Sequence, residues 1–355
     1  MGSAEAPTPF GADAPEMDLD VVHETRYVYA NMVSVAQHMA HLKPLEDEHQ
    51  QLLSFSLAIT PTPSHLREST DGMANAQCHF SLATPHDSLS VRASSRVRVR
   101  ARFGQLQPET SPPWEALAAS LRYVAMAPLQ PEVEYALPSP YVPRLPELRE
   151  YAAASFPPGR PVAVGALSLM HRIYADFKYE SRSTDIDTPL ARAFAQKRGV
   201  CQDFAHLMIG GLRMLGLPAR YVSGYLLTRA ADSGEALVGA DASHAWVQVW
   251  CPGTVGVPQA GPGAGWLALD PTNDMVPATS HVRLAVGRDF GDVTPLRGVI
   301  RGGGRHSLHV GVTTRARPSP TALAGLLVAT FKNQDPGPAP GHPLAEPTGE
   351  QTGEP

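Results

Sequence analysis

Short runs in which apolar and polar residues alternate fill the first third of the chain. Pro, Asp, Gly and Ser residues separate these runs, which read VVHETRYVYA, QLLSFSLAIT, AQCHFSLAT and VRASSRVRVRARF. A period of two residues is typical of a strand with one buried face, and the separating residues are typical of turns. The pattern predicts a small β-rich domain over residues 18–104. Residues 1–17, rich in Ala, Pro and small polar residues, are predicted to be disordered.

Helical spacing appears in the middle of the chain. Residues 105–160 are dense in proline and include PWEALAASLRYVA and PELREYAAASF, which predicts a helical connector. A second domain is predicted over residues 161–314, where apolar residues at helical spacing come first and three strand-like runs follow: ARYVSGYLLT, SHAWVQVWC and GWLALDPT. A helix followed by an antiparallel sheet indicates the α+β class. Residues 315–355, rich in Pro, Gly and Ala, are predicted to be mostly disordered.

Bulk composition narrows the function only slightly. The chain has 355 residues, 43% of them apolar and 18% charged, as in an ordinary soluble globular protein. The formal net charge of −5 gives no overall reason to bind nucleic acid or an anionic membrane, and we expect neither partner. One basic stripe favours a solvated sheet face, with an anionic partner as the less favoured alternative; it consists of Arg96, Arg98, Arg100 and Arg102.

The number and spacing of cysteines and the absence of long apolar runs indicate the cellular compartment of the protein. The three cysteines, Cys78, Cys201 and Cys251, are too few and too far apart to resemble a secreted disulfide framework. The chain does not open on a signal sequence, and no run of 18 apolar residues occurs. We expect a cytoplasmic protein.

Cys201 is the first candidate for chemistry. It stands at the start of an amphipathic helix, closely after Gly199, which is expected to let the incoming backbone turn sharply. A helix N-terminus favours the thiolate, the reactive form of cysteine. Taken alone, the stretch favours the commoner case, a buried cysteine that serves as a small apolar residue.

A nucleophilic cysteine needs a base held by a third group. His206 lies five residues along the same helix, rotated roughly 140° from Cys201, so a packing role is favoured for it. His244 begins a strand and shares one face with Trp246 and Gln248, which makes it the better candidate.

Asp270 is the candidate for the third group. It ends the apolar strand of GWLALDPTND, so its carboxylate is expected at the rim of the sheet, where it could hold the imidazole of His244. The alternative is a turn-forming Asp before Pro271, in which case Asn273 or Asp274 would orient the histidine.

Three blocks in this order resemble the bacterial transglutaminase-like superfamily. They are GVCQDFAHLMIGGLRMLGLPARYVSGYL, DASHAWVQVW and WLALDPTND, and VHETRYVYANMV and HDSLSVRASSRV resemble the N-terminal domain of bacterial members. The resemblance implies a papain-like α+β core preceded by a small β-rich domain. It also implies that Cys201 is the nucleophile, His244 the general base and acid, and Asp270 the residue that orients His244. ANMVSVAQHMAHLKP departs from the arginine-rich ending expected in the N-terminal domain, outside the triad.

The chemistry that follows is acyl transfer on a carboxamide or peptide bond through a thioester, without metal or cofactor. Histidine pairs spaced three residues apart, such as His306 and His309, lack nearby cysteine or acidic partners. The substrate would be a protein or peptide with a glutamine or amide group, with an amine as a possible acceptor. Alternatives are a cysteine peptidase or amidase that uses water, or, less favoured, a peptide-binding module without turnover.

Two residues near the predicted nucleophile carry more specific expectations. The tetrahedral oxyanion needs two donors, and we expect the amide of Cys201 and a group upstream, such as Tyr179 or a neighbouring backbone amide. Asp203, in the first turn of the helix, is expected to point away from the thiol and to bond to the sheet behind the site.

Overall fold

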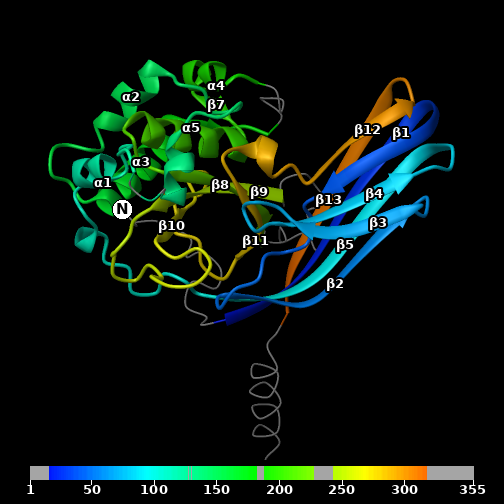
Figure 1. Ribbon diagram of the computed structural model, residues 1–355, viewed down its shortest axis with the longest axis horizontal. Coiled ribbons are helices and arrows are strands. Elements are labelled where there is room, and N and C mark those ends of the chain that lie inside the picture. The colour runs from blue at the N-terminus through cyan, green and yellow to red at the C-terminus, as the bar shows by residue number, and fades with distance from the viewer. Residues whose placement is uncertain (1–15, 127, 129, 182–187, 228–242, 318–355) are drawn as a thin grey trace, which may run out of the picture. The chain divides into compact units, whose positions relative to one another are not determined.

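The computed structural model describes residues 16–126, 128, 130–181, 188–227 and 243–317. These residues form two larger sheets and a group of helices (Figure 1). The first strands and helices are β1 (Glu16–Ala40), β2 (Gln50–Thr60), β3 (His65–Thr70), β4 (Ala76–Leu82), β5 (His86–Arg100), η1 (Pro108–Thr110), α1 (Trp114–Ser120), η2 (Pro131–Ala136), α2 (Pro146–Ala153) and α3 (Val162–Asp176). Then follow β6 (Lys178–Tyr179), α4 (Leu190–Gln196), β7 (Arg198–Gly199), α5 (Cys201–Met214), β8 (Ala219–Leu226), β9 (Ser243–Trp250), β10 (Trp266–Leu269), β11 (His281–Gly287), η4 (Phe290–Asp292), β12 (Leu296–Gly302) and β13 (His306–Arg317).

The long strand β1 organises the first sheet. The strand order is β2-β5-β1-β4-β3, and β12 and β13 also pair with β1. Along its first half β1 lies between β5 and β13, with Leu19 opposite both Val97 and Ala316. Without β12 and β13, β1 would expose a long row of unpaired backbone donors and acceptors. The C-terminal strands satisfy these groups by pairing with β1.

This pairing differs from the predicted domain boundaries. Residues 296–317 lie in the ranges expected for the catalytic domain and the tail, yet they pair with β1. Strand β1 also begins at Glu16, inside the range expected to be disordered. The cause is long-range pairing: the alternation in β13 identifies a strand but not its partner.

Three arginines of the stripe lie on β5 and face acidic residues on β1. The fourth, Arg102, follows β5 and pairs with Asp47. Glu16, Asp18 and Asp20 lie opposite the stripe in the β1–β5 register. The pairs are Arg96–Asp20 at 3.2 Å, Arg98–Asp18 at 2.7 Å and Arg100–Glu16 at 3.3 Å. Partly exposed cross-strand pairs of this kind fit the solvated sheet face favoured from the sequence.

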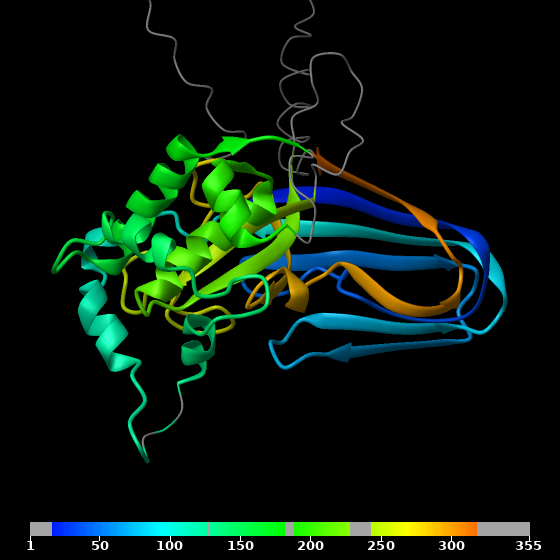
Figure 2. The same ribbon diagram turned by 90° about the horizontal axis from the view of Figure 1, so that it is seen from above.

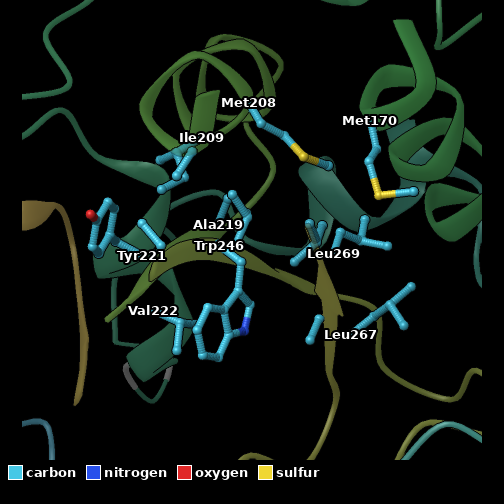
Figure 3. Packing of buried hydrophobic residues seen from close by; sticks show 14 of the residues in the cluster. Met170, Met208, Ile209, Ala219, Tyr221, Val222, Trp246, Leu267 and Leu269 are labelled. Carbon is cyan, nitrogen blue, oxygen red and sulfur yellow. The ribbon is translucent and has the colours of Figure 1, made fainter. Parts of the chain in front are cut away.

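The second sheet carries the candidate chemistry. Its order is β10-β9-β8-β11, with every pairing antiparallel. Helix α5 covers one face, and Met208 and Ile209 point from it toward the sheet (Figure 3). A helix on an antiparallel sheet, with a β-rich region before it, confirms the predicted α+β fold. Among the described helices, none is both long and apolar enough to cross a membrane.

The two sheets are bound to each other along β11. The side chain of Gln50 exchanges two hydrogen bonds of 2.8 Å with the backbone of Arg283, and the side chain of Asn75 does the same with Val286. Buried residues of both sheets, among them Val97 and Val222, belong to one apolar core. Figure 2 shows the helices gathered on one side of the molecule and the long strands on the other. The second sheet is therefore anchored on one face by α5 and along one edge by the first sheet.

Candidate active site

Cys201 is the first residue of α5, and its side chain is partly buried. Val200 precedes it in extended conformation, and the backbone N–H of Val200 donates to the carboxylate of Asp203 over 2.8 Å. The carboxylate thus satisfies an amide at the start of the helix. The candidate nucleophile stands where the helix dipole favours negative charge, as the sequence predicted.

Two neighbours of Cys201 shape the start of its helix. The carboxylate of Asp203 accepts from the backbone N–H of Val200 at the start of its own helix, and its expected bond to the sheet stays a prediction. Gly199 was expected to permit a sharp turn, but its requirement is space: an added Cβ would lie 2.6 Å from both Cβ and Oδ2 of Asp203. Gly199 and Asp203 therefore fit together as a pair that shapes the entry to α5.

His244 and Asp270 come together from neighbouring strands. His244 lies in β9, and Asp270 directly follows β10, whose last pair with β9 is Leu269 with Val247. The antiparallel register thus brings Asp270 back beside the beginning of β9. Nε2 of His244 lies 2.8 Å from Oδ2 of Asp270, and both side chains are buried. The sequence could predict this contact because the two strands are adjacent in the sheet.

The imidazole of His244 interacts with both Asp270 and Cys201. Burial disfavours a charged imidazole, but the charge and hydrogen bond of Asp270, together with a hydrogen bond to Cys201, raise the pKa of His244 to about 10. Burial also disfavours the carboxylate, yet His244 and His281 hold the pKa of Asp270 well below its usual range. With Nε2 turned to Asp270, the ring nitrogen left for the thiol is Nδ1.

Besides His244, further groups form hydrogen bonds with the carboxylate of Asp270. Its Oδ1 accepts from the backbone N–H of Thr272 at 2.9 Å, and Oδ2 accepts from Nδ2 of Asn273 at 2.7 Å. Asn273, considered as an alternative orienter, supports Asp270 and lies 3.3 Å from Nε2 of His244. Asp274, the other alternative, bonds to His171 on α3.

His281 is a member of the cluster that the sequence did not predict. It begins β11, and its Nε2 lies 3.2 Å from Oδ2 of Asp270. Its Nδ1 lies 3.0 Å from the hydroxyl of Ser280. The only signal was a histidine at the start of an apolar strand, and nothing in its spacing connected that strand with Asp270.

His206 lies apart from the cluster, in the packing position that the sequence favoured. Its ring stacks against Tyr141, with 5.8 Å between ring centroids, and its Nε2 accepts from the backbone N–H of Phe290 at 3.2 Å. Burial lowers the pKa of His206 to about 3, so its imidazole is neutral near pH 7. A neutral, bonded ring of this kind serves the core.

Tyr179 lies close to the start of α5. In the short parallel pair of β6 and β7, Tyr179 is opposite Gly199, and the N–H of Glu180 donates to the carbonyl of Gly199 at 3.0 Å. The ring of Tyr179 lies 6.4 Å from that of Phe204. The segment containing Tyr179 therefore runs beside the residues that lead into Cys201.

The same cluster is also the place where a metal ion would fit best among the described residues. Ligand atoms of His244, Asp270 and His281 all lie within 4.8 Å of one another. In the structure these atoms are used in hydrogen bonds, since both histidine Nε2 atoms lie within hydrogen-bond distance of Asp270. The arrangement therefore fits a histidine that a carboxylate orients.

Comparisons with known proteins identify the family of the chain. The family profile of the bacterial transglutaminase-like N-terminal region matches residues 19–98, and that of the transglutaminase-like superfamily matches residues 158–271. An uncharacterized protein of Mycobacterium tuberculosis is 37% identical over 288 residues, which are 79% of this chain and 86% of that protein. An uncharacterized protein of Mycobacterium leprae is 32% identical over 295 residues, 82% of this chain and 95% of that protein.

Two further matches concern a part of the chain and the fold. A stretch of 85 residues, 24% of this chain and 11% of the relative, is 35% identical to the protein-glutamine gamma-glutamyltransferase of Pseudomonas aeruginosa. The structure of a candidate cysteine protease from Cytophaga hutchinsonii shares the fold, with a TM-score of 0.62 and 22% identity over 85% of this chain and 91% of that chain. The family match supports a cysteine-based enzyme, and the chain belongs to the transglutaminase-like superfamily.

Proposed function

We propose that this protein transfers acyl groups from a carboxamide, such as a glutamine side chain, to an amine through a thioester on Cys201. The observation that carries the proposal is the contact of 2.8 Å between His244 and Asp270, which leaves the other imidazole nitrogen for the thiol. A buried carboxylate that holds an imidazole beside a cysteine at a helix start is the arrangement that nucleophilic cysteine catalysis requires.

In the first half of the reaction the Cys201 thiolate attacks the carboxamide carbon. As the tetrahedral intermediate collapses, the C–N bond breaks and the imidazolium of His244 gives its proton to the leaving ammonia. The products are a thioester and a neutral imidazole, still bonded to Asp270.

In the second half an amine attacks the thioester carbon and His244 takes its proton. The C–S bond breaks, Cys201 leaves as thiolate, and His244 is again an imidazolium. With water in place of the amine, the same steps release a carboxylic acid. Transfer and hydrolysis therefore share every residue of the site, and the acceptor decides between them.

The oxyanion would be stabilised at the start of α5. The amide N–H of Cys201 is one proposed donor, because it belongs to the first turn, where amides lack partners within the helix. The second is proposed to come from the segment around Tyr179, which runs beside Gly199.

A product analysis distinguishes the possible activities. The full chain is incubated with a glutamine-containing protein and a fluorescent primary amine, and the products are analysed by mass spectrometry, with Cys201→Ala as the matched control. We expect amine adducts that need Cys201. Deamidated or cleaved products without adducts would indicate hydrolysis, and no product beyond the control would overturn both activities in favour of a binding module.

The setting of the reaction is part of the proposal. We propose a protein or peptide substrate and no nucleic acid or membrane partner. The three cysteines Cys78, Cys201 and Cys251 are all free thiols, which supports the cytoplasm, where thiols stay reduced.

A further inference from the structure

A small cavity lies on the face of the second sheet opposite to α5. Its lining comes from β9, β10, β11, β5 and the loops beside them: His49, Gln50, Val99, Arg100, Arg102, Phe103, Trp246, Gln248, Ala268, Pro277, Ala278, His281 and Arg283. The cavity volume is about 30 Å³, roughly two to three times the space that one water molecule needs. Arg100 and His49 are partly exposed at its rim, with side-chain exposures of 41% and 23%. Solvent therefore reaches two of the lining residues.

Two lining side chains have buried donors without a partner in the described part of the chain. These are Nε1 of Trp246 and Nε2 of Gln248, in residues that are 0% and 1% exposed. Figure 3 shows the indole nitrogen of Trp246 on the edge turned toward β10, the strand that contributes Ala268 to the lining. A buried donor without an acceptor costs about 1–3 kcal/mol, so two at one cavity need an explanation.

The orientation of Gln248 is fixed by its neighbour. Oε1 of Gln248 accepts from Nε of Arg220 at 2.8 Å. Because a guanidinium has no acceptor, the amide cannot turn around, and Nε2 must be the atom left unpaired.

The charges around the cavity are mostly positive. Arg100, Arg102 and Arg283 line it, and the lining contains no carboxylate. Asp47, just outside, bonds to both Arg102 and Arg283, so one negative charge faces two positive ones. Burial, with Arg102 as a nearby cation, lowers the pKa of Arg283 to about 10, which leaves it charged near pH 7.

The remaining ionisable groups do not reverse this balance. Glu16 pairs with Arg100 on the outside, and Glu48 with His49. His281 uses both ring nitrogens, toward Ser280 and Asp270. A site with unpaired donors and surplus positive charge has the chemistry of an anion site.

We propose that this cavity binds a small oxyanion of the carboxylate or phosphate type, to which Trp246 and Gln248 donate hydrogen bonds. The guanidinium groups of Arg102 and Arg283 supply the positive charge. The site is separate from Cys201 but touches the triad, because the ring of His281 lines the cavity while its Nε2 bonds to Asp270. The inference stands independently of the proposed acyl transfer.

The indole N–H of Trp246 gives a direct test by NMR. The chain has 4 tryptophans, so a spectrum of the ¹⁵N-labelled full chain has few indole signals, and Trp246→Phe assigns the relevant one. Sodium phosphate and sodium acetate are added separately, with sodium chloride at equal ionic strength as the reference. We expect a saturable shift of the Trp246 signal, with half-saturation at about 1 mM or below. The signal of Trp114, whose Nε1 donates to Pro157, should stay in place.

Two variants make the outcome decisive. Gln248→Glu keeps the size and the contact with Arg220 but replaces a donor with a negative charge, so affinity should fall at least tenfold. Arg96→Gln should bind as the unmodified protein does, because Arg96 pairs with Asp20 and does not line the cavity. Saturation by phosphate alone or by acetate alone identifies the class of oxyanion. No shift with either, a linear drift common to all indoles, or an unchanged affinity in Gln248→Glu would overturn the proposal in favour of a water-filled cavity.

Discussion

Strand β9 has two faces of different character. The face toward α5 is apolar, with Ala245, Val247 and Val249 all buried. The opposite face carries Trp246 and Gln248, which reach a cavity lined with arginines. One face therefore contributes packing energy, and the other carries polar groups whose donors are not all paired.

The difference indicates how the site keeps its geometry. Close packing against α5 fixes the distance between the helix that begins at Cys201 and the strand that begins with His244. The polar side then holds Asp270 through its hydrogen bond with His281. The apolar face should be sensitive to loss of volume, and the polar face to loss of particular hydrogen bonds.

Removing volume from the apolar face should have the largest effect. Met208 is fully buried on α5 above the sheet (Figure 3). We expect Met208→Ala to lower the free energy of unfolding by about 2–5 kcal/mol, measured by urea denaturation. Leu308→Ala, at a β13 position that is 50% exposed, should change it by no more than about 0.5 kcal/mol. A similar loss of unfolding free energy in both variants would mean that packing against α5 has no special role in stability.

Asp270→Asn should have the next largest effect, on rate and not on fold. The amide keeps the shape but loses the charge that holds the imidazolium of His244. Turnover should fall by about 10²-fold or more, with the circular dichroism spectrum unchanged. Asp274→Asn is the matched control, because Asp274 bonds to His171 and not to His244. Equal rates in the two variants would count against Asp270 as the orienter.

His281→Phe should have a smaller effect, of about tenfold in rate. His281 is a positioning residue: its hydrogen bond to the Asp270 carboxylate helps to keep that group charged. Without it, the acidic limb of the pH–rate profile should move upward, which a merely structural loss would not do. His281→Gln, which retains a donor, should restore part of the rate. An unmoved pH profile in His281→Phe would contradict this role.

The smallest effect is expected in the pH dependence of stability. The pKa of His244 is raised from 6.5 to about 10, so its pairing stabilises the fold fully below pH 6.5 and less as pH rises toward 10. The pKa of Asp270 is lowered from 3.8, so its contribution is present above that pH and is lost on acidification. The free-energy difference between the unmodified protein and Asp270→Asn should therefore shrink between pH 7 and pH 10 in urea denaturation. A constant difference would contradict the charged pair.

The sequence predicted features that rest on local patterns or on neighbouring strands. Helical spacing after Cys201 identified α5, and consecutive strands placed His244 near Asp270. Features that depend on long-range pairing could not be predicted. Nothing in the sequence of β13 indicates that it pairs with β1. His281 contacts Asp270 from β11, the edge strand opposite to β10 in the sheet. The role of Gly199 was misjudged because the space beside Asp203 is visible only once the helix start is folded.

The reactivity of the three cysteines tests the central claim most directly. Burial raises the pKa of both Cys78 and Cys251, whereas Cys201 has His244 as a partner. With limiting iodoacetamide near pH 7 and peptide mapping by mass spectrometry, Cys201 should be alkylated at least about tenfold faster than the other two. In His244→Ala this preference should largely disappear, while His206→Ala should retain it wherever the fold is intact. Equal labelling of all three cysteines in the unmodified protein, or an undiminished preference in His244→Ala, would contradict a nucleophile activated by His244.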